Sequence, residues 1–88
     1  MTIQIEDTTI PTAIPGLRFD FNFGARVTVP EGQGQWRVRF IDRDLFMVLS
    51  DTKFERGTLT SSLKYYINYR VEIYHEEQLV FTHDLDLN

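Results

Sequence analysis

The chain has 88 residues, no cysteine and a formal net charge of −4 at pH 7. This length corresponds to one domain, the missing cysteines exclude disulfides and thiolate metal sites, and the acidic balance argues against generic binding to nucleic acid. Hydrophobic residues make up 42% of the sequence and aromatic residues 14%, which is typical of a folded domain whose small core depends on large rings.

The first fifteen residues are predicted to be an extended lead-in, because Pro11 and Pro15 favour extended backbone. Ile3 and Ile5 could add a short edge strand here. The segment has neither the basic nor the apolar region of a signal peptide, and no apolar run in the sequence approaches membrane-spanning length. We therefore expect a cytoplasmic protein with a single domain over residues 16–88.

From residue 16 onward, short runs of alternating apolar and polar side chains are separated by turn-forming residues, as in a series of antiparallel strands. The predicted strands in this part are residues 17–21, 25–29, 35–42, 45–49 and 58–60. Residues 50–53 have the composition of a turn. The run from Leu45 to Leu49 is apolar on both faces. It predicts a strand that is covered on both sides or whose outer face meets another surface.

Residues 64–75 form the longest run with an unbroken two-residue period, which predicts a strand with one buried and one solvated face. A polar loop over 75–78 then returns the chain into a last strand over 79–85. The residues of this last strand that are expected to face inward are Leu79, Phe81, His83 and Leu85.

No stretch longer than two turns has a helical period. We therefore predict an all-β fold, a small and mostly antiparallel barrel or sandwich of about six to seven strands. The residues expected to be mostly buried in it are Phe19, Phe21, Val27, Trp36, Val38, Phe40, Tyr69, Val71 and Phe81.

The sequence predicts no catalytic residue, no cofactor and no metal site. His75 and His83 fall at opposite ends of the returning strand, so they are not expected to converge on one metal ion. No serine lies in a Gly-x-Ser-x-Gly elbow. The loop Gly32-Gln33-Gly34 is too short for a phosphate-binding loop and lacks the lysine of one.

Arginine and tyrosine gather on the outward-facing positions of the predicted strands. The set is Arg18, Arg26, Arg37, Arg39, Tyr66, Arg70 and Tyr74. These residue types are favoured at protein interfaces and in sugar sites. The alternative is an outer sheet face laced by ion pairs with Asp20 and Glu72. The sequence leaves both interpretations open.

Two blocks of the sequence resemble one known family, the bacterial autotransporter heptosyltransferases, in their N-terminal region. The first block is GLRFDFN at 16–22, with GARV at 24–27, PEG at 30–32 and WRVR at 36–39. The second block is SLKYYINYRVEI at 62–73, with FTHD at 81–84. Together they cover nearly all of the chain from Gly16 onward.

The resemblance implies a cytoplasmic glycosyltransferase that transfers heptose from a nucleotide sugar to hydroxyl groups of autotransporter adhesins. It also implies a small N-terminal β-barrel before a two-lobed catalytic region, and a large homo-oligomer. The chain departs from the family pattern at Leu63, where a polar residue is expected, and at the insertion-like Gln33-Gly34. The catalytic region is not among the 88 residues. We therefore carry over no catalytic residue and expect an isolated accessory domain or a short stand-alone relative.

Our first functional hypothesis is a non-catalytic accessory domain of a heptosyltransferase-like enzyme. It would work by protein–protein contact, in oligomer assembly or in docking to the catalytic region or the acceptor protein. The first candidate contact face contains Phe46 and Val48. The second candidate face contains Arg18, Arg37, Arg39, Tyr66, Arg70 and Tyr74.

The alternative hypothesis is a stand-alone carbohydrate-binding β-module. Its stacking platforms would be Trp36, or Tyr66 and Tyr74. The two hypotheses differ in where the aromatic side chains lie. Trp36 shares the inward parity of Val38 and Phe40, so we expect it to be buried, which favours the accessory domain.

Overall fold

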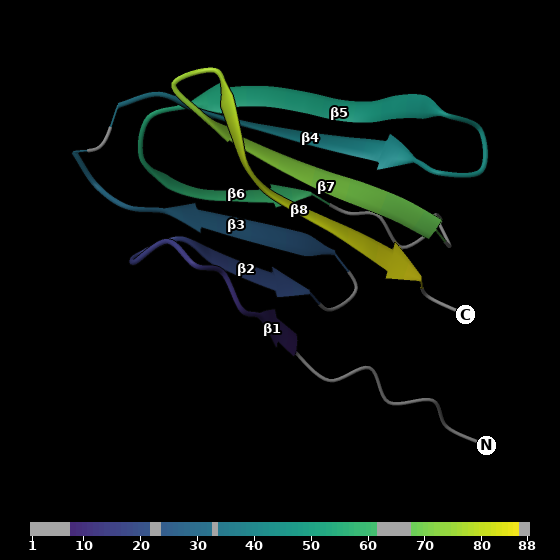
Figure 1. Cartoon of the computed structure of the whole chain (residues 1–88), viewed down its shortest axis with the longest axis horizontal. Helices are drawn as coiled ribbons and strands as arrows, with labels where there is room; N and C mark the ends of the chain where they lie inside the picture. The colour runs from purple at the N-terminus through teal and green to yellow at the C-terminus, as the bar shows by residue number, and fades with distance from the viewer. Residues whose placement is uncertain (1–7, 22–23, 33, 62–67, 87–88) are drawn as a thin grey trace.

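The computed structural model describes residues 8–21, 24–32, 34–61 and 68–86. Over these residues the chain forms eight strands in two four-stranded antiparallel sheets, with no helix (Figure 1). One sheet has the order β1-β2-β3-β6 and the other the order β5-β4-β7-β8. The strands are β1 (Thr8–Ile10), β2 (Arg18–Phe21), β3 (Ala25–Val29), β4 (Trp36–Asp42), β5 (Met47–Phe54), β6 (Gly57–Ser61), β7 (Asn68–His75) and β8 (Gln78–Asp86).

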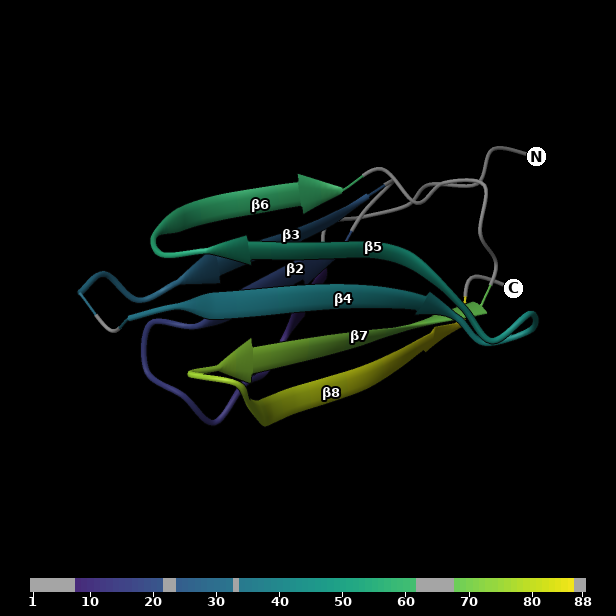
Figure 2. The ribbon, with the colours of Figure 1, turned by 90° about the horizontal axis from the view of Figure 1, so that it is seen from above.

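The two sheets face each other as a sandwich, which is evident when the molecule is seen from above (Figure 2). This confirms the all-β, antiparallel prediction. The fold is not the closed barrel that the family resemblance implied. At one side of the sandwich only Glu55 and Arg56 lie between β5 in one sheet and β6 in the other. Gly57 follows them with a φ of 92°, a left-handed conformation that glycine adopts without steric cost.

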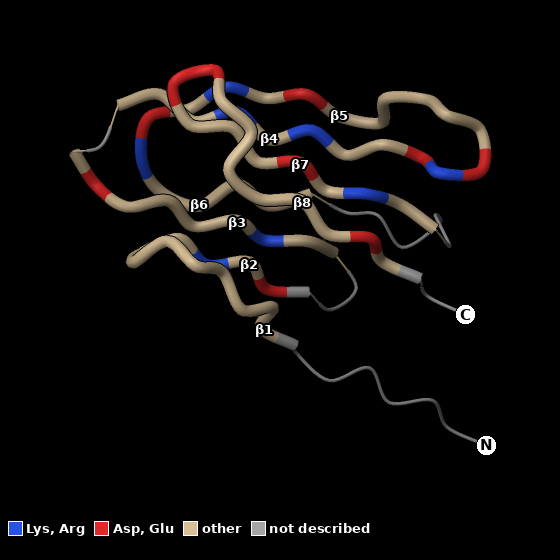
Figure 3. The backbone as a smooth tube through the Cα atoms, in the orientation of Figure 1, with Lys and Arg blue, Asp and Glu red and all other residues tan. Residues whose placement is uncertain are grey.

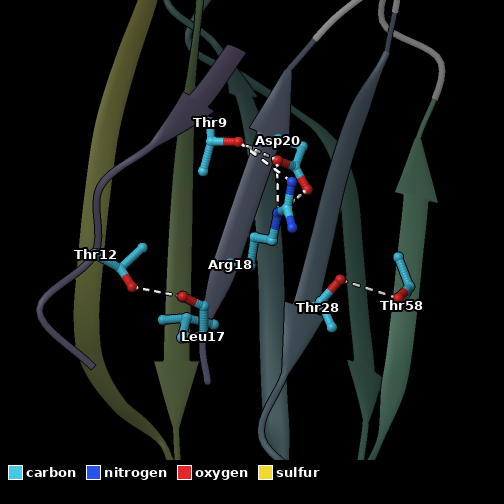
Figure 4. Close-up of polar contacts among 7 residues, drawn as sticks. All are labelled: Thr9, Thr12, Leu17, Arg18, Asp20, Thr28 and Thr58. Carbon is cyan, nitrogen blue, oxygen red and sulfur yellow. Dashed lines mark hydrogen bonds and ion pairs between the residues drawn. The ribbon is translucent and has the colours of Figure 1, made fainter. Parts of the chain in front are cut away.

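The strand count exceeds the predicted six to seven partly because of β1. This strand lies in the expected lead-in and pairs with β2, with Thr9 opposite Asp20. The chain then turns back, and Thr12 donates a hydrogen bond of 2.6 Å to the carbonyl of Leu17 (Figure 4). The possible strand at Ile3 and Ile5 lies outside the described residues.

The core forms between the two sheets, and β4 shows why. Its side chains alternate strictly, so that Trp36, Val38 and Phe40 are buried while Arg37 and Arg39 are only partly covered. Two pairs of aromatic rings pack edge to face in this core. The ring centroids of Phe19 and Phe81 lie 6.1 Å apart, and those of Phe40 and Tyr69 lie 6.0 Å apart. The buried hydrophobic residues are Leu17, Phe19, Ala25, Val27, Val29, Trp36, Val38, Phe40, Tyr69, Val71, Ile73 and Leu85.

Seven of the nine predicted core residues are therefore confirmed as buried. Phe81 is only half-buried and packs at the margin of the core. The side chain of Phe21 lies outside the described part of the structure.

Two β-bulges account for the places where the alternation misled us. In β8, Phe81 pairs with Ile73 and Leu79 with Tyr74, so Val80 is an extra residue. A bulge reverses the facing of the residues beyond it. Leu79, predicted to face inward, is consequently 51% exposed.

The second bulge lies in β5, and the predicted turn at residues 50–53 is wrong. These residues form the middle of β5, with Asp51 opposite Arg39 on β4. Their polar side chains suggested a turn. In the structure they lie on β5, an edge strand of its sheet, where Asp51 forms ion pairs with Arg37 and Arg39 of β4. The bulge itself is at Leu49, because Ser50 pairs with Phe40 and Val48 pairs with Ile41.

Replacing Val71 tests the core assignment. Val71→Ala removes two buried methyl groups between the sheets, so we expect a loss of about 2 kcal/mol in the free energy of unfolding, measured by urea denaturation. Val80→Ala is the matched control, because Val80 is 38% exposed and should change stability by less than about 0.5 kcal/mol. Equal effects of the two substitutions would mean that the facing of β7 is wrong.

Candidate functional site

The connection between β4 and β5 is a turn that is anchored by hydrogen bonds and carries exposed apolar residues. Asp42 is buried at the end of β4, and its carboxylate oxygen Oδ1 accepts hydrogen bonds from the backbone N–H groups of Asp44 and Leu45, at 2.8 and 3.1 Å. This is the local pattern by which aspartate stabilises a turn. The backbone N–H of Arg43 also donates to the carbonyl of Asn68 at 3.2 Å, which fastens the turn to β7.

In the second half of this turn and at the start of β5 the chain exposes four consecutive apolar residues, which we call the apolar tip. They are Leu45, Phe46, Met47 and Val48, with exposed fractions of 66%, 87%, 55% and 46%. The tip lies at one end of the molecule, at the right in Figure 1. Exposed apolar residues are ordinary when scattered, but a contiguous group of them marks an interaction site.

Phe46 also has an unfavourable backbone conformation. Its φ is 55°, in the left-handed region, which costs roughly 1–2 kcal/mol for a residue with a Cβ atom. A bulky residue rarely adopts this conformation, and such outliers cluster at functional sites. The exposed ring gains little from burial within this domain to offset that strain. A glycine at this position would avoid the strain, so the Phe46 side chain costs stability within this domain.

The sequence predicted Phe46 and Val48 as a contact face, but it predicted a different backbone structure for them. We predicted one strand over 45–49 with an unsatisfied outer face. In the structure Leu45 and Phe46 belong to the turn, and β5 begins at Met47. The bulge at Leu49 separates the tip from the rest of β5. Apolarity on both faces was therefore the signal of an exposed hairpin end.

The second predicted face is divided between the two sheets. Arg18 lies on β2, where its Nε donates to Asp20 at 2.9 Å and Thr9 donates to the same carboxylate at 2.7 Å (Figure 4). Arg37, Arg39, Arg70 and Tyr74 lie on the other sheet. Tyr66 lies outside the described residues. The set therefore does not form one continuous face.

On the β5-β4-β7-β8 sheet, Arg39 lies opposite Asp51 and Glu72, and Arg70 lies opposite Asp84. Figure 3 shows basic and acidic positions on these neighbouring strands. Arg37 Nε donates to Asp51 at 2.7 Å, and Arg70 Nε donates to Asp84 at 2.6 Å. Arg39 lies 3.9 Å from the cross-strand Glu72. We call these six residues the ion-pair face.

The pairing has electrostatic consequences for the two aspartates. The hydrogen bond from Arg37 holds the pKa of Asp51 below its ordinary value, and the hydrogen bond from Arg70 does the same for the pKa of Asp84. The Tyr74 hydroxyl donates a hydrogen bond of 3.1 Å to Glu72. The Arg37 guanidinium lies 5.9 Å from the centre of the Tyr74 ring. The cross-strand pairing that the sequence left open is thus present.

The histidines do not converge with other ligands. His75 stacks on Trp36 with ring centroids 4.2 Å apart, and His83 lies against Phe81. Among the described residues, no three His, Asp or Glu side chains gather as a metal site requires. The same residues contain no helix that could cross a membrane.

Lowering the pH should weaken the ion-pair face. The pKa values of Asp51 and Asp84 are lower in the folded state, so their stabilising contribution is present above the unfolded pKa near 3.8. It is lost as the pH falls through the folded values. We expect the urea midpoint to fall from about pH 5 downward, modestly because these pairs are exposed. The double variant Asp51→Asn/Asp84→Asn should show a flatter pH profile, and an unchanged profile would contradict the assignment.

Comparison with known proteins places this fold in one family. Residues 14–77 match the family described as "Glycosyltransferase TibC, N-terminal domain". The autotransporter heptosyltransferase TibC of Escherichia coli O78:H11 is 36% identical over 70 residues, which are 80% of this chain and 17% of TibC. The inactive autotransporter heptosyltransferase BimC of Burkholderia thailandensis is 38% identical over 71 residues, which are 81% of this chain and 16% of BimC.

A solved structure agrees with these relatives. The crystal structure of the dodecameric iron-containing heptosyltransferase TibC with ADP-D-β-D-heptose has a TM-score of 0.73 and 33% identity, and the match covers 94% of this chain and 22% of that chain. The iron named for that structure belongs to TibC. The described residues of this chain contain no group of three His, Asp or Glu side chains that could hold a metal ion. The chain spans less than a fifth of the length of the two relatives. It belongs to the N-terminal domain family of the autotransporter heptosyltransferases.

Proposed function

We propose that this chain is a non-catalytic accessory domain of a heptosyltransferase-like enzyme that modifies autotransporter adhesins, and that it works by protein–protein contact through the apolar tip. One observation carries the proposal. Phe46 is 87% exposed and holds a φ of 55°, so it is unfavourable in both its surroundings and its backbone. A contact that buries the ring would offset that double cost.

The comparison with BimC supports a role that is separate from catalysis. BimC is named an inactive heptosyltransferase, yet it matches this chain at 38% identity, against 36% for TibC. A domain needed only for the transfer reaction would be free to diverge in an inactive relative.

We propose a neighbouring subunit as the partner of the apolar tip. TibC is dodecameric, and in any assembly of identical subunits each copy presents the same tip. Burying a Phe or Val side chain contributes about 1.5–3 kcal/mol, so two such residues are enough to matter in a contact of ordinary size. The cytoplasmic location expected from the family is part of this proposal. Docking to a catalytic region or to the acceptor protein would use the same exposed residues.

The ion-pair face is the next candidate surface. Two of its three arginines, Arg37 and Arg70, already donate to carboxylates at 2.6–2.7 Å. A partner would have to replace these hydrogen bonds, so the face offers less net gain than the apolar tip.

The tip can be tested in the complete product of the gene. Phe46→Ser/Val48→Ser should weaken subunit association by tenfold or more, because the contact loses two apolar anchors. Light scattering after size-exclusion chromatography measures the association, and heptose transfer is measured alongside.

The matched control for this experiment is Leu79→Ser/Val80→Ser. It also replaces two exposed apolar residues with serine, at exposed fractions of 51% and 38%, but on β8. The control should assemble and transfer heptose as the wild type does. If the tip variant also keeps wild-type assembly and transfer, the tip is not the contact surface, and Arg37, Arg39 and Arg70 would be substituted next.

A further inference from the structure

A hollow of about 330 Å³ lies beside the apolar tip, between the β4–β5 turn and the start of β7. Phe46 and Ile41 give it an apolar part, while Arg43, Asn68 and Arg70 give it polar groups. Its described lining is completed by Asp44. Leu45, Met47 and Val48 do not line it. The hollow and the rest of the tip can therefore serve different partners.

The polar groups around the hollow hold one another in place. Asn68 Nδ2 donates to Asp44 Oδ1 at 3.2 Å. Arg70 Nε donates to Asp84 Oδ1 at 2.6 Å, and the Arg43 guanidinium lies 3.8 Å from the other oxygen of the same carboxylate. Side chains fixed in this way lose little conformational freedom when a ligand binds.

The charges around the hollow balance. Two guanidinium groups, of Arg43 and Arg70, and one carboxylate, of Asp44, line the hollow, and both guanidinium groups also pair with the carboxylate of Asp84, which is not part of the described lining. An anion would gain less from these guanidinium groups, because Asp84 already pairs with both. What remains is a set of hydrogen-bond donors and acceptors close to an aromatic ring.

We infer that this hollow is a subsite for a neutral sugar ring. A sugar presents hydroxyl groups, which both donate and accept, and an apolar C–H face that can pack on Phe46. Ligand pockets typically start at about 300 Å³ and combine apolar walls with a few fixed polar groups. The class of ligand is an uncharged glycoside, as found on a glycosylated protein. The pairing of both guanidinium groups with Asp84 disfavours the phosphorylated sugar of a donor.

This subsite differs from the carbohydrate-binding module that the sequence suggested. Trp36 is 1% exposed and stacks on His75 inside the fold, so it cannot serve as a platform. Tyr74 is half-buried and bonded to Glu72. The inference does not rest on the proposed protein contact, but both use Phe46, so a sugar on that ring and a subunit that buries it would exclude each other.

The experiment is an NMR titration of the ¹⁵N-labelled 88-residue chain with methyl α-D-mannopyranoside, a neutral glycoside. The side-chain N–H signals of Asn68 and Arg70 report on the hollow, and the backbone N–H of Glu77, in the turn at the opposite end of β7, serves as the internal reference. We expect the first two to shift with a dissociation constant on the order of 1–10 mM, while Glu77 stays unchanged.

Phe46→Leu should weaken this binding about fivefold, because it keeps an apolar side chain but removes the ring face. Tyr74→Leu is the matched control, an aromatic residue outside the hollow, and should bind as the wild type does. Phe46→Leu should also keep subunit assembly, since the tip remains apolar. Loss of sugar binding with intact assembly therefore separates this inference from the proposed contact.

Three results would overturn the inference. The first is the absence of shifts at Asn68 and Arg70 at concentrations well above millimolar. The second is tenfold tighter binding of mannose 1-phosphate than of the methyl glycoside, which would make the hollow an anion site. The third is wild-type affinity in Phe46→Leu.

Discussion

The two-sided pairing of β4 is the constraint on which the rest of the structure depends. This strand is hydrogen-bonded to β5 along one edge and to β7 along the other, from Trp36 to Asp42. Its inner side chains fill the middle of the core, and its outer arginines form ion pairs with carboxylates on the neighbouring strands. Its last residue, Asp42, is buried and shapes the turn that presents the apolar tip. The core, the ion-pair face and the tip are thus fixed by one strand.

The two-residue period of the sequence was enough to predict the fold class and most of the core, because a strand with one buried face repeats every second residue. It failed where the period breaks. The bulges at Leu49 and Val80 each insert one residue, and nothing in the local composition marks where an insertion falls. The turn wrongly predicted at 50–53 has a different origin. Asp51 of this segment pairs with Arg37 and Arg39 of β4, and the local sequence does not reveal these distant partners.

The apolar and polar pattern of the sequence also predicted part of the candidate site. Apolarity on both faces of residues 45–49 led to the prediction that Phe46 and Val48 meet another surface. It could not show that Phe46 has a left-handed backbone, because φ depends on how Asp42 and Asn68 hold the turn. The arginine and tyrosine set, by contrast, looked like one face, and the sheet topology divides it. The hollow was not predicted at all, because it joins the β4–β5 turn to residues of β7 far along the chain.

The central claim is that Phe46 is kept for contact at the expense of stability, a trade that functional sites commonly show. Phe46→Gly tests it most directly, with Glu77→Gly as control, because Glu77 is also exposed with a positive φ of 69°. Unfolding of the 88-residue chain should show both variants more stable than the wild type by roughly 0.5–1 kcal/mol. This is the free energy gained by removing the left-handed strain, minus the entropy cost of ordering a glycine. Only Phe46→Gly should weaken assembly of the complete gene product. A Phe46→Gly variant that is less stable than the wild type, or that assembles normally, would contradict the account.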